Sequence, residues 1–206
     1  MVESGGFYNT FIDPVLVPMR KIVASYIRPG EKVIDLACGT GAQVFEIAGV
    51  AKKAVGIDLS QSMIKKAGKI KLVTKSNNTE FFVGDIVELE MFGDNEFDVA
   101  TMSLALHQFD SQIYKDVFSE MIRISGRIII TDYSVPLQAG FKGYATKFVE
   151  FLAGREHYRN FREYCCLGGL EAILKNYSLK TISQRKMAFG IFQVLECYPD
   201  ETNASK

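Results

Sequence analysis

The chain has 206 residues, of which 48% are hydrophobic and 23% charged, as in an ordinary globular protein. Its 24 basic and 24 acidic residues cancel, so net charge provides no general attraction to nucleic acid or anionic lipid. No stretch approaches the ~18 apolar residues of a membrane helix, and no basic-then-apolar leader opens the sequence. We therefore expect a single cytoplasmic domain over residues 1–206, with no membrane span and no nucleic-acid partner.

Strand-like and helix-like segments alternate along the chain. The expected helices cover residues 14–27, 41–50, 60–73, 111–124, 137–164 and 167–177. Ser60 should be the N-cap of the helix at 60–73, and the helix at 111–124 should have one apolar face. The segment 137–164 also has apolar residues along one stripe. The expected strands cover residues 32–37, 53–58, 79–85, 96–105, 126–133, 178–188 and 190–198. Such alternation forms βαβ units with right-handed crossovers, so the sequence predicts an α/β fold with a parallel sheet covered on both faces.

The last two predicted strands meet at Gly190. This junction is too short for a helical crossover, so the two strands should be antiparallel neighbours. We therefore expect a doubly wound, seven-stranded sheet that is mostly parallel and has an antiparallel last strand. Residues 1–30 should form an N-terminal cap with a helix. The helical insert at residues 137–165, after the fifth strand, should form a lid over the carboxyl ends of the strands.

The four cysteines are expected to be reduced thiols. Cys38, Cys165, Cys166 and Cys197 do not form the disulfide framework of a small secreted domain. The adjacent pair, Cys165 and Cys166, could bond only through a strained ring. The sequence has no Cys-x-x-Cys or His-x-x-x-His spacing, so no structural zinc site is expected.

The stretch VIDLACGTGAQV at residues 33–44 joins the first strand to a helix through small residues. Small residues let the backbone approach a ligand closely: a phosphate, a dinucleotide or the amino-acid end of S-adenosylmethionine. A Walker loop would need Gly-Lys-Ser/Thr, which does not follow Gly41. A dinucleotide fingerprint would need glycine in place of Val44, which weakens that interpretation without excluding it.

The run Asp-x-Ala-Cys-Gly-Thr-Gly at residues 35–41 resembles motif I of class I S-adenosylmethionine-dependent methyltransferases, with Ala37 in place of the usual first glycine. The segments GIDLS (56–60), VGDI (83–86) and FDVATMSLALHQF (97–109) follow in the family's order. The resemblance covers residues 31–133 and is nearest to the type 11 subgroup that includes quinone-biosynthesis methyltransferases. It implies a Rossmann-like sheet and S-adenosyl-L-methionine as cofactor, with S-adenosyl-L-homocysteine as product.

The resemblance also implies a role for each matching residue. The loop would contact the methionyl end of the cofactor, with Asp35 near its ammonium group. Asp58 would accept both ribose hydroxyls and Asp85 the adenine amino group, although Asp58 could instead cap a helix and Met63 could simply be core. The expected cofactor-binding residues are Asp35, Ala37, Cys38, Gly39, Gly41, Asp58, Leu59, Met63, Gly84, Asp85, Ile86, Ser103, Leu104 and Tyr8.

Four polar residues are candidates for catalysis: His107, Asp132, His157 and Tyr158. The first two follow predicted strands and should lie at the rim where ligands bind. His107 would be a base or an acceptor-orienting group, or else a loop histidine packed under the lid. A bound magnesium ion would need carboxylates after both the fourth and fifth strands, and only Asp132 is available. We therefore expect no metal.

The resemblance implies methyl transfer by in-line displacement to a small, aromatic or lipophilic acceptor. Quinone specificity does not carry over, because the N-terminal entry GGFYNTFIDPVLVP differs from the quinone enzymes and the chain has no tryptophan. A protein methyltransferase, or a protein that binds S-adenosylmethionine without methyl transfer, remains an alternative. We expect a monomer or a homodimer.

Overall fold

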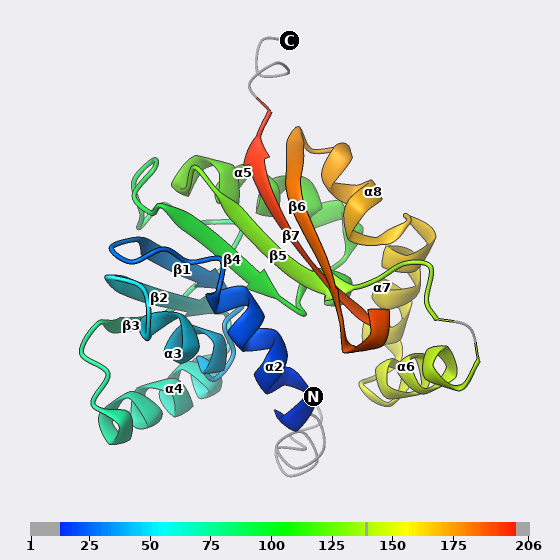
Figure 1. The fold of residues 1–206 in the computed structure, drawn as a ribbon, viewed down its shortest axis with the longest axis horizontal. Helices are drawn as coiled ribbons and strands as arrows, with labels where there is room; N and C mark the ends of the chain where they lie inside the picture. The colour runs from blue at the N-terminus through cyan, green and yellow to red at the C-terminus, as the bar shows by residue number, and fades with distance from the viewer. Residues whose placement is uncertain (1–12, 139, 201–206) are drawn as a thin grey trace.

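Short apolar runs of the sequence form the strands of one seven-stranded sheet (Figure 1). The computed structural model describes residues 13–138 and 140–200. The strands are β1 (Lys32–Leu36), β2 (Lys53–Asp58), β3 (Thr79–Val83), β4 (Val99–Ser103), β5 (Ile128–Tyr133), β6 (Leu179–Met187) and β7 (Phe192–Pro199). The α-helices are α2 (Asp13–Ala24), α3 (Ala42–Ala48), α4 (Gln61–Thr74), α5 (Tyr114–Ile124), α6 (Phe141–Leu152), α7 (Arg155–Cys166) and α8 (Gly169–Lys175). The short 3₁₀ turns are η2 (Leu106–Gln108), η3 (Ser111–Ile113) and η4 (Ala188–Gly190).

The strand order is β3-β2-β1-β4-β5-β7-β6. Strands β1 to β5 are parallel, and β7 runs antiparallel to both β5 and β6. This confirms the predicted doubly wound, mostly parallel sheet with an antiparallel last strand. Because the strand order reverses between β1 and β4, right-handed crossovers place α3 and α4 on one face and α5 on the other. Helix α2 packs beside α3 (Figure 1).

The helix boundaries follow local chemistry. Helix α4 begins after Ser60, whose hydroxyl accepts a hydrogen bond from the Met63 amide at 3.4 Å, which confirms the predicted N-cap. The predicted helical segment 137–164 is two helices, α6 and α7. They are separated at Gly154, whose φ of 123° is a conformation that only glycine adopts readily. No described helix is long and apolar enough to cross a membrane.

The core lies on both faces of the central strands. All six residues of β5 are buried, as expected for a parallel strand covered on each side. On α5 the side chains of Val117, Met121 and Ile124 are fully buried, which confirms the predicted apolar face of that helix.

A buried arginine joins three parts of the fold at the amino end of the sheet. Arg127, which precedes β5, donates from Nη2 to both carboxylate oxygens of Glu31, at 2.7 and 2.6 Å. Its Nη1 donates to Glu196 of β7 at 2.8 Å and to the Tyr26 carbonyl at 3.0 Å. Only 4% of Arg127 is exposed, so its removal would leave two carboxylates largely out of water without a partner.

We expect Arg127→Met to lower the free energy of unfolding by about 3–5 kcal/mol, since breaking a buried ion pair leaves an uncompensated charge. The matched control is Lys53→Met, which removes the exposed pair between Lys53 and Glu80 (N···O 2.9 Å) and should cost under about 1 kcal/mol. Urea unfolding of the two variants and the parent chain measures both values. If both variants lost the same small amount of unfolding free energy, the buried Arg127 network would stabilise the fold no more than an exposed ion pair.

Candidate functional site

The residues expected to bind a cofactor gather where the strand order reverses. The carboxyl ends of β1, β2, β3 and β4 lie side by side, because these strands are parallel neighbours in the order β3-β2-β1-β4. In open α/β sheets the crevice at such a reversal is where ligands bind. The loop after β1 therefore faces the ends of the neighbouring strands.

The loop after β1 follows a path that requires small residues. Ala37, Gly39 and Gly41 all have positive φ, at 54°, 55° and 80°. Glycine adopts this conformation freely, whereas alanine does so at a cost of about 1 kcal/mol, so Ala37 is strained relative to the family's glycine. A Cβ atom on Gly41 would lie 2.5 Å from the Phe81 ring. Position 41 thus has no room for a side chain next to Phe81 of β3, whereas a Cβ atom on Gly39 would meet nothing within 4 Å.

Asp58, at the end of β2, is directed at this loop. Its Oδ2 accepts a hydrogen bond from the Gly39 amide at 2.7 Å, and its Oδ1 accepts one from the Ser60 amide at 2.8 Å. The carboxylate therefore lies between the glycine loop and the start of α4. This is the position in which the resemblance places the ribose carboxylate.

Cys38 is a buried residue of the loop, and its backbone hydrogen-bonds to β2. Its amide donates to the Ile57 carbonyl at 3.0 Å, and a Cβ atom on Gly56 would lie 2.8 Å from its sulfur. Burial raises the pKa of the Cys38 thiol far above its ordinary value, with further increases from the negative charges of Asp35 and Asp58. The thiol is consequently unreactive, and its role is packing.

Asp35, in β1, is buried beside β4. The Thr101 hydroxyl donates to its Oδ1 at 2.6 Å. Burial raises the pKa of Asp35 to about 7; the Thr101 hydrogen bond opposes the rise, and the charge of Asp58 adds to it. Near neutral pH this carboxyl is therefore divided between its neutral and ionised forms, and a nearby cation would favour the ionised form.

The remaining predicted cofactor residues line the ends of β2, β3 and β4. Leu59 is 71% exposed and Met63 36% exposed, so Met63 is not core. Asp85 is exposed and accepts a hydrogen bond from the Val87 amide at 3.2 Å, while the neighbouring Ile86 is buried. Exposed apolar side chains and the exposed carboxylate of Asp85 therefore lie near the carboxyl ends of β2 and β3.

Three further residues complete the predicted set near β3 and β4. A Cβ atom on Gly84 would lie 2.7 Å from Ile57, which explains the glycine. The Ser103 hydroxyl is buried and has no hydrogen-bond partner among the described residues, and Leu104 adopts a φ of 53°. An unpaired buried hydroxyl at a strand end is costly unless a ligand meets it. Tyr8 lies outside the described residues.

Two of the catalytic candidates meet at the ends of β4 and β5. His107, in η2, approaches Asp132 with Nδ1 2.7 Å from Oδ1, and its amide donates to Oδ2 at 3.2 Å. Asp132 is fully buried and also accepts the Tyr133 amide at 2.7 Å. Because an ionised carboxylate only accepts hydrogen bonds, the Nδ1 of His107 carries the proton.

The helical insert brings a third candidate, His157, to the same place. Glu150 of α6, which the sequence analysis did not identify, hydrogen-bonds to His157 Nε2 through Oε2, and this Oε2 lies 3.6 Å from His107 Nε2. The Tyr133 hydroxyl donates to Glu150 Oε1 at 2.6 Å. The only hint in the sequence was an acidic residue on an otherwise apolar helical stripe, which does not identify its partners.

These contacts shift the pKa of both central groups. Burial alone would lower the pKa of His107, but the carboxylates of Asp132 and Glu150 outweigh it and raise the pKa to about 9. Burial would raise the pKa of Glu150, but hydrogen bonding and charge from His107 and His157 hold it well below its ordinary value. At neutral pH the protonated imidazole of His107 thus donates a hydrogen bond to Asp132 and lies at ion-pair distance, 3.6 Å, from Glu150.

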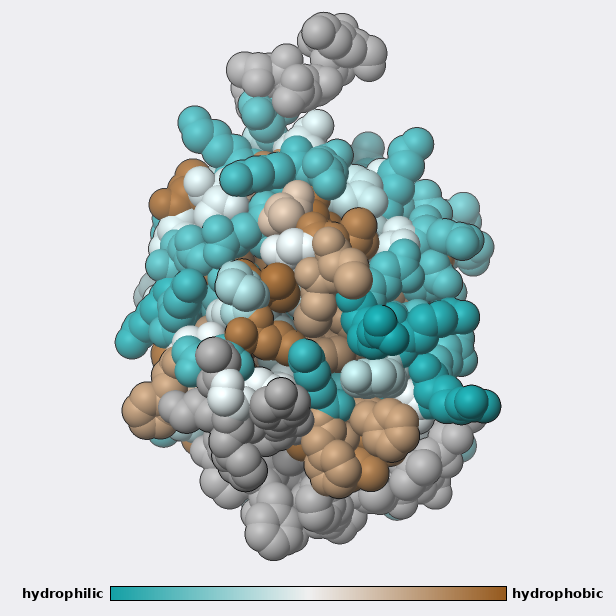
Figure 2. All heavy atoms as spheres, turned by 90° about the vertical axis from the view of Figure 1, so that its right-hand side faces the viewer, coloured by the Kyte–Doolittle hydropathy of each residue, from teal (hydrophilic) through white to brown (hydrophobic). Residues whose placement is uncertain are grey.

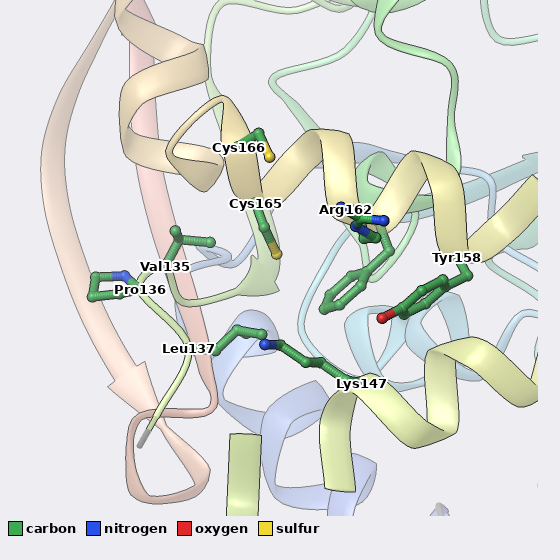
Figure 3. Close-up of a pocket in the computed structure, with 9 residues that line it drawn as sticks. Val135, Pro136, Leu137, Lys147, Tyr158, Arg162, Cys165 and Cys166 are labelled. Carbon is green, nitrogen blue, oxygen red and sulfur yellow. The ribbon is translucent and has the colours of Figure 1, made fainter. Parts of the chain in front are cut away.

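Tyr158, the fourth candidate, follows His157 on α7. It lines a cavity of about 400 Å³ between α6, α7 and the segment after β5 (Figure 3). Lys147, Arg162 and Cys165 also line this cavity. The structure therefore brings His107, Asp132 and His157 together but separates Tyr158 from them.

The outer surface of the insert is apolar. Phe148, Phe151 and Leu152 of α6 are each more than half exposed. In Figure 2 hydrophobic side chains gather in the middle of the face that carries the insert, between hydrophilic ones. The apolar stripe read from the sequence thus includes side chains that point to solvent.

The chain is similar to known methyltransferases in sequence and in fold. A family model described as a methyltransferase domain matches residues 27–181. The demethylmenaquinone methyltransferases of Bacillus cereus and Bacillus anthracis are 32% identical over 151 residues, 68% of this chain. The match spans 62% of the length of those curated relatives, which is less than two thirds.

Solved structures share the fold at lower identity. A protein of Pyrococcus horikoshii superposes with a TM-score of 0.71 at 20% identity, over 94% of this chain and 98% of that one. A SAM-dependent methyltransferase of Aquifex aeolicus gives 0.63 at 14% identity, over 87% and 88%. The cyclase SpnF gives 0.66 at 14% identity, over 88% and 79%. With the family model matching three quarters of its length, the chain belongs to the class I S-adenosylmethionine-dependent methyltransferases.

Proposed function

We propose that this chain binds S-adenosyl-L-methionine at the β1–β4 reversal and transfers its methyl group to a small aromatic or lipophilic acceptor, leaving S-adenosyl-L-homocysteine. The carrying observation is the carboxylate of Asp58, which two backbone amides, one of them from Gly39 of the loop, hold at the end of β2. The family's ribose carboxylate occupies this place in the motif. The demethylmenaquinone methyltransferase relatives favour a lipophilic acceptor.

The residues present fit this cofactor. A Cβ atom on Gly39 would meet nothing within 4 Å, so a methionyl group would approach the loop there, and the Asp35 carboxyl would favour its ammonium once ionised. The buried, unpaired hydroxyl of Ser103 would gain a partner. The bound cofactor supplies an electrophilic methyl group on its sulfonium. The protein would then align the acceptor and exclude water, and such positioning supplies roughly 7–11 kcal/mol in well-oriented reactions.

The acceptor would approach from the side of the insert. His107 follows β4 and faces Glu150 of α6, and the rings of Tyr133 and Phe161 pack against the imidazole. Because His107 is already protonated near neutral pH, it would not remove a proton; its Nε2–H would orient an acceptor oxygen, or stabilise its negative charge, by turning from Glu150 to the acceptor.

We expect Asp58→Ala to weaken binding of S-adenosylmethionine by at least ~100-fold, since the two charge-assisted hydrogen bonds from the ribose hydroxyls to the carboxylate would be lost. Isothermal calorimetry measures the affinity, and the exposed Glu90→Ala is the matched control. Asp58→Asn keeps an acceptor for the Gly39 amide, so it separates loss of the ribose contact from loosening of the loop. Undiminished binding by Asp58→Ala would contradict the assigned site.

We also expect cofactor affinity to depend on the ionisation of Asp35. Its pKa of about 7 in the free protein means that binding an ammonium group below pH 7 requires loss of a proton. The affinity for S-adenosylmethionine should therefore rise roughly tenfold from pH 5.5 to pH 7. This range lies below the ordinary pKa of an α-amino group, so the ammonium group of the cofactor stays charged throughout. The charged and polar groups that face Asp35 are Thr101, Asp58 and Cys38.

The variant Asp35→Asn provides the control for this pH dependence. It keeps a hydrogen-bonding side chain beside Thr101 but cannot ionise, so its affinity should be weaker and nearly constant from pH 5.5 to pH 7. Calorimetry at both pH values compares it with the parent chain. An equal pH slope in the two proteins would assign the titration to another group.

The fold alone does not decide the reaction, since the [4+2]-cyclase SpnF shares it. Detection of S-adenosylhomocysteine after incubation with phenolic and quinol acceptors would support methyl transfer to small molecules. A labelled methyl group found only on polypeptide would favour a protein substrate. Tight cofactor binding without S-adenosylhomocysteine in any mixture would favour a protein that uses the cofactor without transferring its methyl group.

A further inference from the structure

Two histidines and a glutamate converge from three separate elements. His107 comes from η2, Glu150 from α6 and His157 from α7. The Nε2 atoms of the histidines and a carboxylate oxygen of Glu150 all lie within 4.8 Å of one another. His107 and Glu150 are buried, while His157 is partly exposed and leaves a way in from solvent.

Hydrogen bonds from neighbouring residues orient these side chains so that their potential ligand atoms face one another. The Nδ1–H of His107 donates to the buried carboxylate of Asp132, which leaves Nε2 facing Glu150. Metal-binding histidines commonly donate their other ring N–H to a carboxylate in this way. The Tyr133 hydroxyl occupies Oε1 of Glu150 and leaves Oε2 directed at both imidazoles.

The charge of the cluster also suits a cation. Asp132 and Glu150 bring two carboxylates into the interior, 0% and 4% exposed. Among the side chains that the structure describes, neither carboxylate pairs with a lysine or an arginine. In the metal-free protein the imidazole of His107 compensates part of this negative charge, and one divalent cation would balance both carboxylates.

We propose that His107, Glu150 and His157 form a binding site for a divalent transition metal, with Zn²⁺ as the best-fitting ion. Two imidazoles and one carboxylate are a known zinc ligand set, which leaves a fourth position for water. Ligand atoms around tetrahedral zinc are about 3.3 Å apart. The separation of 3.6 Å between His107 Nε2 and Glu150 Oε2 is close to this spacing, and a separation of 4.8 Å, the upper limit within the cluster, would close by about 1.5 Å through side-chain torsions.

Binding would exchange protons for the metal. Any proton on the Nε2 atoms of His107 and His157 would leave to solvent as each nitrogen lone pair binds the ion. The metal would then join the two helices of the insert to the end of β4.

This site departs from our expectation of no metal, because that expectation relied on ligand spacing along the chain, whereas these ligands meet only in the fold. The site does not depend on cofactor binding, but a metal on Nε2 of His107 would replace the acceptor-orienting N–H proposed for that residue.

The test uses the full chain without a polyhistidine tag. Titration with Zn²⁺ against a chromophoric chelator should give one ion per chain, and 1 mM Mg²⁺ should not compete, because Mg²⁺ prefers oxygen ligands. Substitution by Co²⁺ should produce the visible absorption of a four- or five-coordinate ion. At 100 times the dissociation constant, Zn²⁺ should raise the melting temperature by roughly 5–10 °C.

Variants tie the binding to these residues. Glu150→Gln and His157→Gln keep the size of the side chain and should each weaken Zn²⁺ binding at least ~100-fold, and Asp132→Asn should weaken it ~10–100-fold. The matched control Glu156→Gln removes an exposed carboxylate from α7 and should bind normally. Circular dichroism and S-adenosylmethionine affinity report whether each variant is folded.

The proposal is overturned if the parent chain binds no Zn²⁺ below about 100 µM, if His157→Gln binds as tightly as the parent, or if Glu156→Gln loses as much affinity as Glu150→Gln. None of these outcomes bears on cofactor binding, since Asp58 and the glycine loop lie at the ends of β1 and β2 rather than in this cluster. A failure of the metal site and a failure of the proposed function are therefore separate results.

Discussion

The reversal of strand order between β1 and β4 is the constraint on which the site depends. Right-handed crossovers then send helices to opposite faces and leave a crevice at the carboxyl ends of these strands. The tight loop after β1, Asp58 after β2 and Ser103 at the end of β4 border that crevice. Without the reversal, a helix would cover the strand ends and the same residues would have no ligand to meet.

The insert after β5 adds a second, ionic layer to this edge of the sheet. Asp132 links β5 to η2 through two hydrogen bonds to His107, and Glu150 links His107 to both helices of the insert. Burial would separate these charges from water at considerable cost if they were unpaired. Their mutual compensation is what allows a polar cluster to lie among Tyr133, Phe161 and Tyr164.

The strands and most helices were predictable because periodicity, turn residues and caps are local signals. Ser60 as an N-cap and the apolar face of α5 depend on neighbours within a few positions, and both are confirmed. The cofactor loop was also readable, since Gly39 and Gly41 allow the backbone conformation that the turn requires. Glu150 was missed because nothing near it in the chain signals that it faces His107, 43 residues earlier in the sequence.

The sequence by itself determined the βαβ order, the antiparallel last strand and the positions of the loop and of Asp58, because each follows from chemistry within one or two elements. Only the tertiary structure decided that Asp132, Glu150 and His157 surround His107 while Tyr158 faces another cavity. The packing of α6 and α7 against the strand ends sets these distances. Such packing depends on the shapes of side chains far apart in the chain, which a one-dimensional pattern does not record.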